Sequence, residues 1–202
     1  APLMLGQSLL TVDEWYGRWF GGLLGAGTVA HLAYARRLVL VPVAVVGQAV
    51  GAAALPTLAR LHVEGSHDEL SRLVGQALRA SLAFALLAAA GFMVFAAPLV
   101  GFVYQRGAFG PSDAAVVAAI LRVSCLAVPF WVLQQIAVRA FYARGDTLRP
   151  MLLSSAITLA AIPLYLQLGT AGGVLGIALA GVLGIGANAL ATAEAVRGEM
   201  DK

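Results

Sequence analysis

The sequence predicts an all-α polytopic membrane protein, a six-helix transmembrane bundle, on three observations. Hydrophobic residues make up 60% of the 202 residues and charged residues only 11%, which is too little polar surface for a water-soluble domain. The apolar runs are mostly longer than the roughly 20 residues that a helix needs to cross a bilayer. Turn-forming and charged residues are concentrated between these runs.

The apolar runs divide a single transmembrane lobe, residues 1–202, into six expected spans. They cover approximately residues 3–27, 28–58, 72–104, 112–142, 151–168 and 171–196. The first is the weakest because charged residues fall near its middle. The chain begins Ala1-Pro2-Leu3 with no features of a signal peptide, and we expect it to be a piece of a longer protein.

Basic residues indicate the orientation of the spans. If all six cross, the loops and span ends on one side hold Arg60, Arg72, Arg79, Arg139, Arg144, Arg149, Arg197 and Lys202, and the loops on the other side hold only Arg106. Cytoplasmic loops are enriched in lysine and arginine. The C-terminus is therefore expected in the cytoplasm, and an even number of spans places the N-terminus there too.

Small residues and prolines predict how the spans pack and bend. Gly172, Gly176, Ala180 and Gly184 form a stripe at a spacing of four, which allows close helix packing in a membrane. Pro42, Pro98, Pro129 and Pro163 each fall inside a span, where a missing backbone donor favours a kink. A static bundle fits the glycines alone, whereas four kinked spans favour a transporter whose helices move.

Arg36 and Arg37 lie about two turns into the second span. An arginine at this depth costs a few kcal/mol on insertion scales, so it usually faces a cavity or a partner. Adjacent helix positions point about 100° apart, so the two cannot face the same way. We expect one to line a polar cavity while the other snorkels or pairs; the simpler alternative is that both snorkel.

The first span carries three charged candidates. Glu14 and Arg18 are four residues apart in the order that favours an ion pair, so mutual neutralisation competes with a cavity-facing role. Asp13 points elsewhere. It either meets Arg37 across the helix interface or binds a proton or cation.

The fourth span carries a further polar set, Arg122, Gln134, Gln135 and Arg139, with Trp131 among them. These side chains are candidates for contact with a polar headgroup. For Arg139 an interfacial anchor is the simpler interpretation.

Several classes of function are not expected. The single cysteine, Cys125, excludes thiolate-cluster metal sites and Cys-x-x-Cys redox chemistry within the chain. The sequence has no nucleophile elbow, phosphate-binding loop or dinucleotide fingerprint, and no basic block typical of nucleic-acid binding. We therefore expect no enzyme, no cofactor, no metal site and no nucleic-acid partner.

Several segments together resemble a known family. They are Tyr34-Ala35-Arg36-Arg37-Leu38 with Pro42, Gly47-Gln48-Ala49-Val50, Ala54-Leu55-Pro56-Thr57-Leu58, Arg106-Gly107-Ala108-Phe109, and Phe141-Tyr142-Ala143-Arg144-Gly145-Asp146-Thr147 with Pro150. Their order and spacing resemble the C-terminal lobe, about helices seven to twelve, of MurJ/MviN-type lipid II flippases of the MOP exporter superfamily. The resemblance covers essentially the whole chain.

The resemblance implies alternating access by two six-helix lobes that move an undecaprenyl-linked peptidoglycan precursor across the cytoplasmic membrane. It implies three kinds of partner: a lipid-linked anionic substrate, membrane lipids and an N-terminal lobe. It also assigns Arg37 as the contact to the anionic headgroup, and a guanidinium fork suits pyrophosphate. Some relatives carry an acid where this chain has Leu40, which leaves Asp13 or Glu14 as counter-charges.

The coupling ion and the cargo stay open. Certain relatives bind sodium through amide and acidic side chains on the fifth span, but residues 151–168 contain no Asp, Glu or Asn, so proton coupling or drive by membrane potential remain alternatives. The cargo could instead be an O-antigen-type lipid carrier or a cationic drug, although a cationic drug would favour an acidic cavity. From another class, the chain could be a non-transporting scaffold for cell-wall enzymes.

Overall fold

The computed structural model describes residues 18–19, 22, 27–48, 67–143 and 145–200, and every regular element in this part of the chain is helical. The all-α prediction is therefore confirmed for the described residues. The elements are α2 (Thr28–Pro42), the π-helix η1 (Val43–Gln48), α4 (His67–Val94), α5 (Ala96–Tyr104), α6 (Pro111–Cys125), α7 (Val128–Ala143), α8 (Leu148–Ala160) and α9 (Ile162–Met200).

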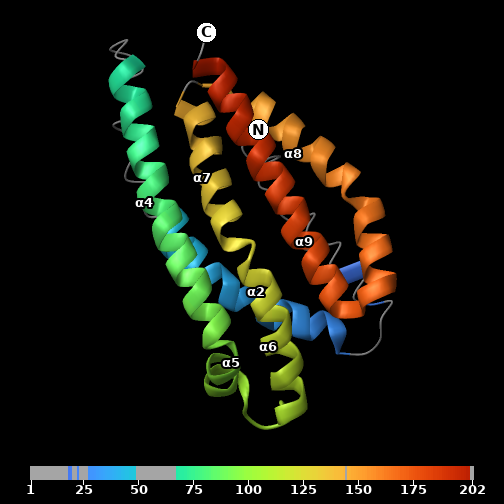
Figure 1. The fold of residues 1–202 in the computed structure, drawn as a ribbon. Coiled ribbons are helices and arrows are strands. Elements are labelled where there is room, and N and C mark those ends of the chain that lie inside the picture. The colour runs from blue at the N-terminus through green and yellow to red at the C-terminus, as the bar shows by residue number, and fades with distance from the viewer. Residues whose placement is uncertain (1–17, 20–21, 23–26, 49–66, 144, 201–202) are drawn as a thin grey trace.

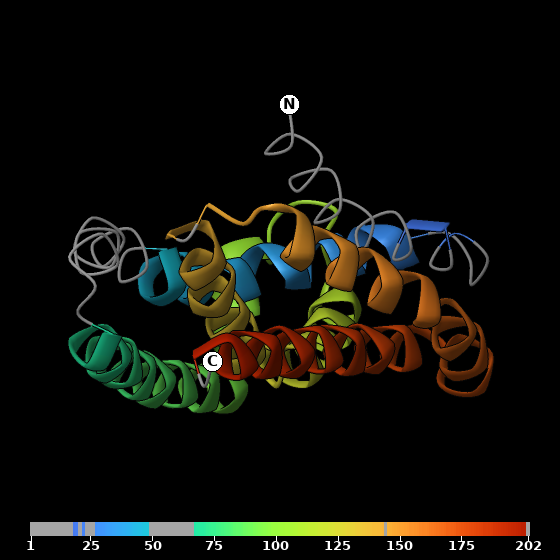
Figure 2. The ribbon, with the colours of Figure 1, turned by 90° about the horizontal axis from the view of Figure 1, so that it is seen from above.

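The long helices run along one common direction, and α2 crosses them obliquely (Figure 1). The α6–α7 pair ascends between α4 and α9, and α7 packs against both of these helices. Viewed from above, α4 and α9 lie along one side of the bundle and α2 and α8 along the other (Figure 2). Helix α2 packs mainly against α6 and also contacts α9. Side chains of α2 therefore lie between these two helices.

Each proline expected to kink a span lies next to a change in the helix. The π-helix begins directly after Pro42, and α5, α7 and α9 each begin one to two residues before Pro98, Pro129 and Pro163. Proline lacks the backbone N–H that would bond four residues back, so the regular ladder is interrupted there. The bend of 46° between α6 and α7, beside Pro129, confirms the kink expected there, and the kinks expected at the other three prolines stay predictions.

Three described helical stretches are long and apolar enough to cross a membrane: Thr28–Val45, Gly75–Val94 and Leu148–Gly198. The arms Pro111–Cys125 and Val128–Tyr142 provide a fourth if they form one span, bent by 46°. Most of the expected span at residues 3–27 lies outside the described residues.

The stretch Leu148–Gly198 contains a helical hairpin. Its turn lies at Gly173, whose φ of 57° and ψ of −136° suit a residue without a side chain. The chain descends through α8 and the first part of α9, then reverses and ascends to the C-terminus (Figure 1). A Cβ added at Gly176 would meet the backbone carbonyl of Leu168. Small residues thus allow the two arms to approach closely, as the glycine stripe predicts.

The buried core is built largely from small and branched side chains of α2, α4, α6 and α7, among them Ala35, Ala85, Ile120 and Val132. Many large apolar side chains are instead exposed, including Phe84, Leu87 and Phe102. A lipid-facing surface accounts for this distribution, since hydrocarbon solvates such side chains without cost.

Candidate functional site: two adjoining pockets

The adjacent arginines of α2 diverge, as helix geometry predicts. Arg36 is half-buried and lines a pocket inside the bundle. Arg37 is exposed, and its guanidinium lies over the ring of Tyr34 at 5.9 Å from the centroid. Tyr34 packs in turn against Tyr104 and Phe109, with centroid separations of 4.7 and 5.4 Å. Arg37 thus rests on an aromatic cluster outside the pocket.

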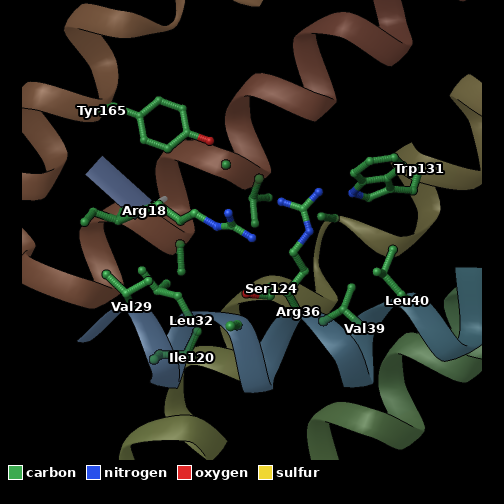
Figure 3. Close-up of a pocket in the computed structure, with 16 residues that line it drawn as sticks. Arg18, Val29, Leu32, Arg36, Val39, Leu40, Ile120, Ser124, Trp131 and Tyr165 are labelled. Atoms are coloured by element: carbon green, nitrogen blue, oxygen red, sulfur yellow. The ribbon is translucent and has the colours of Figure 1, made fainter. Parts of the chain in front are cut away.

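The pocket that Arg36 lines has a volume of about 140 Å³ and lies between α2, α6, α7 and α9. Arg18, which precedes α2 in the chain, lines the same pocket. Figure 3 shows both guanidinium groups pointing into one space, with the hydroxyl end of Tyr165 turned toward it. We call this space the cationic pocket.

The walls of the cationic pocket are mostly apolar. Among the described lining residues, Ser124, Trp131 and Tyr165 are the uncharged polar members, aliphatic side chains and glycine supply the rest of the wall, and none is acidic. Charges in a low-dielectric setting interact more strongly than in water. Two guanidinium groups that face one space provide donors for an anionic group.

A second pocket, of about 100 Å³, lies between α7, α8 and α9. Its polar side chains are uncharged: Trp131, Gln134, Gln135, Tyr142, Ser154, Thr158 and Asn188. We call it the amide pocket. The Ser154 hydroxyl donates to Asn188 Oδ1 at 3.1 Å, which ties α8 to the second arm of α9.

Trp131 lines both pockets, so its indole lies at the boundary between them. It begins a row of α7 residues, with Gln134, Gln135 and Val138, at the spacing that keeps side chains on one helix face. The two pockets are therefore neighbours that share one aromatic side chain.

One polar contact joins α2 to α6, two of the helices that line the cationic pocket. His31 Nε2 on α2 lies 3.0 Å from Asp113 Oδ1 on α6. The other carboxylate oxygen of Asp113 accepts a hydrogen bond from the Gly110 backbone N–H at 3.0 Å, and Pro111 occupies the first turn. Asp113 thus caps the first turn of α6 and holds α2 beside it.

The other sequence candidates fall elsewhere. Arg122 is exposed on α6 and lines neither pocket. Asp13 and Glu14 lie outside the described residues, so their expected role as counter-charges stays a prediction. Within the described ranges, no three His, Cys, Asp or Glu side chains gather in a way that could hold a metal ion.

The sequence alone indicates only part of the amide pocket. Gln134, Gln135 and Trp131 stand out as polar residues in an apolar span, whereas Ser154 and Asn188 are not among the candidates that the sequence predicts. The available signal is the spacing of four between Ser154 and Thr158, which places two hydroxyls on one face of α8.

The fold is that of one lobe of a MOP superfamily transporter. A solved lipid II flippase MurJ in an inward closed conformation superposes with a TM-score of 0.84 at 22% identity, covering 97% of this chain and 41% of that one. A MOP superfamily transporter from Pyrococcus furiosus, described as having a binding pocket of reverse polarity, gives a TM-score of 0.84 at 18% identity, covering 100% of this chain and 44% of that one.

Residues 1–193 match the family described as lipid II flippase MurJ, and the chain belongs to this family. A probable lipid II flippase MurJ from Rhizobium meliloti is 35% identical over 164 residues, which are 81% of this chain and 31% of the relative. The chain thus spans about a third of that relative's length. With its apolar helices, family membership makes it an integral protein of the bacterial inner membrane.

Proposed function

We propose that this chain forms the C-terminal lobe of a transporter that moves lipid II, the undecaprenyl-linked peptidoglycan precursor, across the inner membrane. The observation that carries the proposal is the cationic pocket, where Arg18 and Arg36 face one mostly apolar space. Family membership supports the cargo. A positive pocket suits an anionic headgroup and opposes a cationic drug, so drug antiport is the weaker alternative.

The chemistry of the cationic pocket suits a pyrophosphate. A guanidinium offers a planar fork of donors to phosphate oxygens and keeps its charge in a poorly hydrated site. Arg36 projects from α2 and Arg18 from the preceding segment, so a bound diphosphate would bridge two parts of the chain. Arg37, exposed on another side of α2, is a second headgroup contact in this proposal, on a surface available to a partner lobe.

The proposal includes the surroundings of the lobe. Its C-terminus lies in the cytoplasm, an N-terminal lobe completes the transport path, and lipids surround the exposed apolar side chains. Proton, cation or membrane potential drives the cycle. A lobe without its partner supplies one wall of a cavity, so the 202 residues alone should not translocate lipid in proteoliposomes.

The test compares arginine variants in the complete product of the gene, reconstituted in lipid nanodiscs. Arg36→Ala should raise the Kd for a polyprenyl pyrophosphate at least about tenfold, since a hydrogen bond to a charged group contributes ~1.5–3 kcal/mol. Arg36→Lys should retain part of the affinity, because lysine keeps the charge but not the fork. Arg197→Ala, an exposed arginine near the end of α9, is the control and should bind as the wild type does.

Two results would overturn this assignment. If Arg36→Ala binds like the wild type while Arg37→Ala loses binding, the headgroup meets the aromatic cluster and not the cationic pocket. If the wild type binds no pyrophosphate lipid and moves none in proteoliposomes, the chain is not part of a flippase. That result would favour a non-transporting scaffold for cell-wall enzymes.

A further inference from the structure

We propose that the amide pocket binds an uncharged sugar ring of a lipid-linked headgroup while the attached pyrophosphate occupies the cationic pocket. The inference rests on the proposed function and extends it from the charge of the cargo to its carbohydrate. It assigns a sugar-recognising role to Gln134 and Asn188.

The composition of the amide pocket matches a neutral, hydroxyl-rich ligand. Its polar groups are amides, hydroxyls and the indole of Trp131, and none of the lining residues that the structure describes carries a charge. Amides offer both donors and acceptors, as sugar hydroxyls do. Aromatic rings supply an apolar wall with a polar edge. An ion would find no opposite charge among these residues, whereas a sugar would find partners for its hydroxyls.

Gln134 supplies the observation that points to a ligand. Its side chain is only 7% exposed, yet it lines the pocket. Its Oε1 is buried and has no hydrogen-bond partner. Buried polar atoms in folded proteins are nearly always paired, because an unpaired one loses its hydration without compensation. An incoming hydroxyl or amide N–H would satisfy this acceptor after a small rotation of the side chain.

Asn188 lies in the same pocket with its orientation already set. Its Oδ1 accepts a hydrogen bond from Ser154 at 3.1 Å and lies 3.5 Å from the Thr192 hydroxyl. Thr192 is itself buried and donates to the Asn188 backbone carbonyl at 2.7 Å. With the carbonyl side of the amide so engaged, its nitrogen can donate to a sugar oxygen. A group held in place in advance loses less entropy on binding.

The position of the amide pocket fits a sugar joined directly to a phosphate. Trp131 lines both pockets. A ligand that extends past its indole from one pocket into the other would therefore contact two guanidinium groups at one end and neutral amides at the other. A glycosyl pyrophosphate has the same order of groups, because its anionic diphosphate is joined directly to an uncharged sugar.

The experiment uses the complete gene product in nanodiscs and two lipids, a polyprenyl pyrophosphate and the same lipid carrying one N-acetylated hexose. The wild type should bind the glycosylated lipid about five- to tenfold more tightly, as expected for one or two neutral hydrogen bonds. Gln134→Leu should abolish this preference and leave the Kd for the sugar-free lipid unchanged. Ser154→Ala, which frees Asn188, should reduce the preference by about half.

Gln167→Leu makes the same chemical change at an exposed position of α9 and should alter neither Kd. Binding of the sugar-free lipid also shows that each variant is folded. If the wild type binds both lipids equally, or if Gln134→Leu keeps the preference, the sugar site is refuted while the anion site stands. If the wild type binds neither lipid, the proposed function itself fails.

Discussion

The cationic pocket and the amide pocket share Trp131 and the helix α9, but they obtain their polar groups from different parts of the fold. The charge of the cationic pocket comes from Arg36 on α2 and from Arg18 before it. The amide pocket has no residue from α2 and takes its polar groups from α7 and the α8–α9 hairpin. The oblique helix α2 and Arg18 before it therefore make the difference between a pocket with cationic side chains and a neutral pocket.

The largest expected effect comes from the hairpin, because α9 lines both pockets. In Gly176→Ala the new Cβ would lie against the Leu168 carbonyl, a backbone group that no side-chain rotation can move away. Overpacking of this kind costs about 1–3 kcal/mol. We expect a lower Tm in detergent and weaker binding of both the sugar-free and the glycosylated lipid.

Gly172→Ala is the matched control in the same hairpin. A Cβ there meets nothing within 4 Å, so Tm and both Kd values should stay close to those of the wild type. Equal Tm values for the two variants would show that the arms do not approach as closely as described. A loss confined to one lipid would show that α9 supports only one pocket.

The next largest effect is expected at the shared side chain. Trp131→Ala would join the two pockets and admit water beside Arg36, which weakens electrostatic attraction by raising the local dielectric. We expect the Kd for the sugar-free lipid to rise about tenfold, equivalent to ~1.4 kcal/mol, and the preference for the glycosylated lipid to disappear.

Trp131→Phe keeps an aromatic wall and should retain most of both properties. Titration of the two lipids in nanodiscs measures both. If Trp131→Ala changes the binding of the glycosylated lipid alone, Trp131 belongs to the amide pocket only, and the pockets do not act as neighbours.

Much of the fold follows from the sequence because its signals are local. Hydropathy identifies the apolar helices, and a missing N–H at Pro129 accounts for the bend between α6 and α7 wherever those helices lie. The stripe of small residues predicts the close approach at Gly176 in the same way. The oblique course of α2 is different in kind, since it depends on packing against α6 and α9, which are far away in the sequence.

The candidate site is predictable in part for the same reason. A 100° rotation per residue guarantees that Arg36 and Arg37 diverge, but it does not say which one faces inward. Packing decides this: Val29, Leu32 and Arg36 form one row along α2 that faces α6 and α9. The family resemblance favours Arg37, and its role stays a prediction. Serine and asparagine give little hydropathy signal, which is why the amide pocket emerges only when α8 and α9 are placed together.

The smallest expected effect separates the pockets most cleanly. His31→Gln weakens the contact with Asp113, which holds α2 beside α6 and so affects only the cationic pocket. Both side chains are partly exposed, so the contact contributes little and the Kd for the sugar-free lipid should rise no more than about threefold. The ratio of the Kd values for the sugar-free and the glycosylated lipid should stay constant, because the amide pocket contains no residue of α2 or α6.

Asp113→Asn should raise the Kd for the sugar-free lipid by a similar factor, and the double variant should add little, as expected for two partners in one contact. A change in the sugar preference of His31→Gln would show that α2 controls both pockets, and the contrast between them would then lie in their residues and not in the helices that supply them.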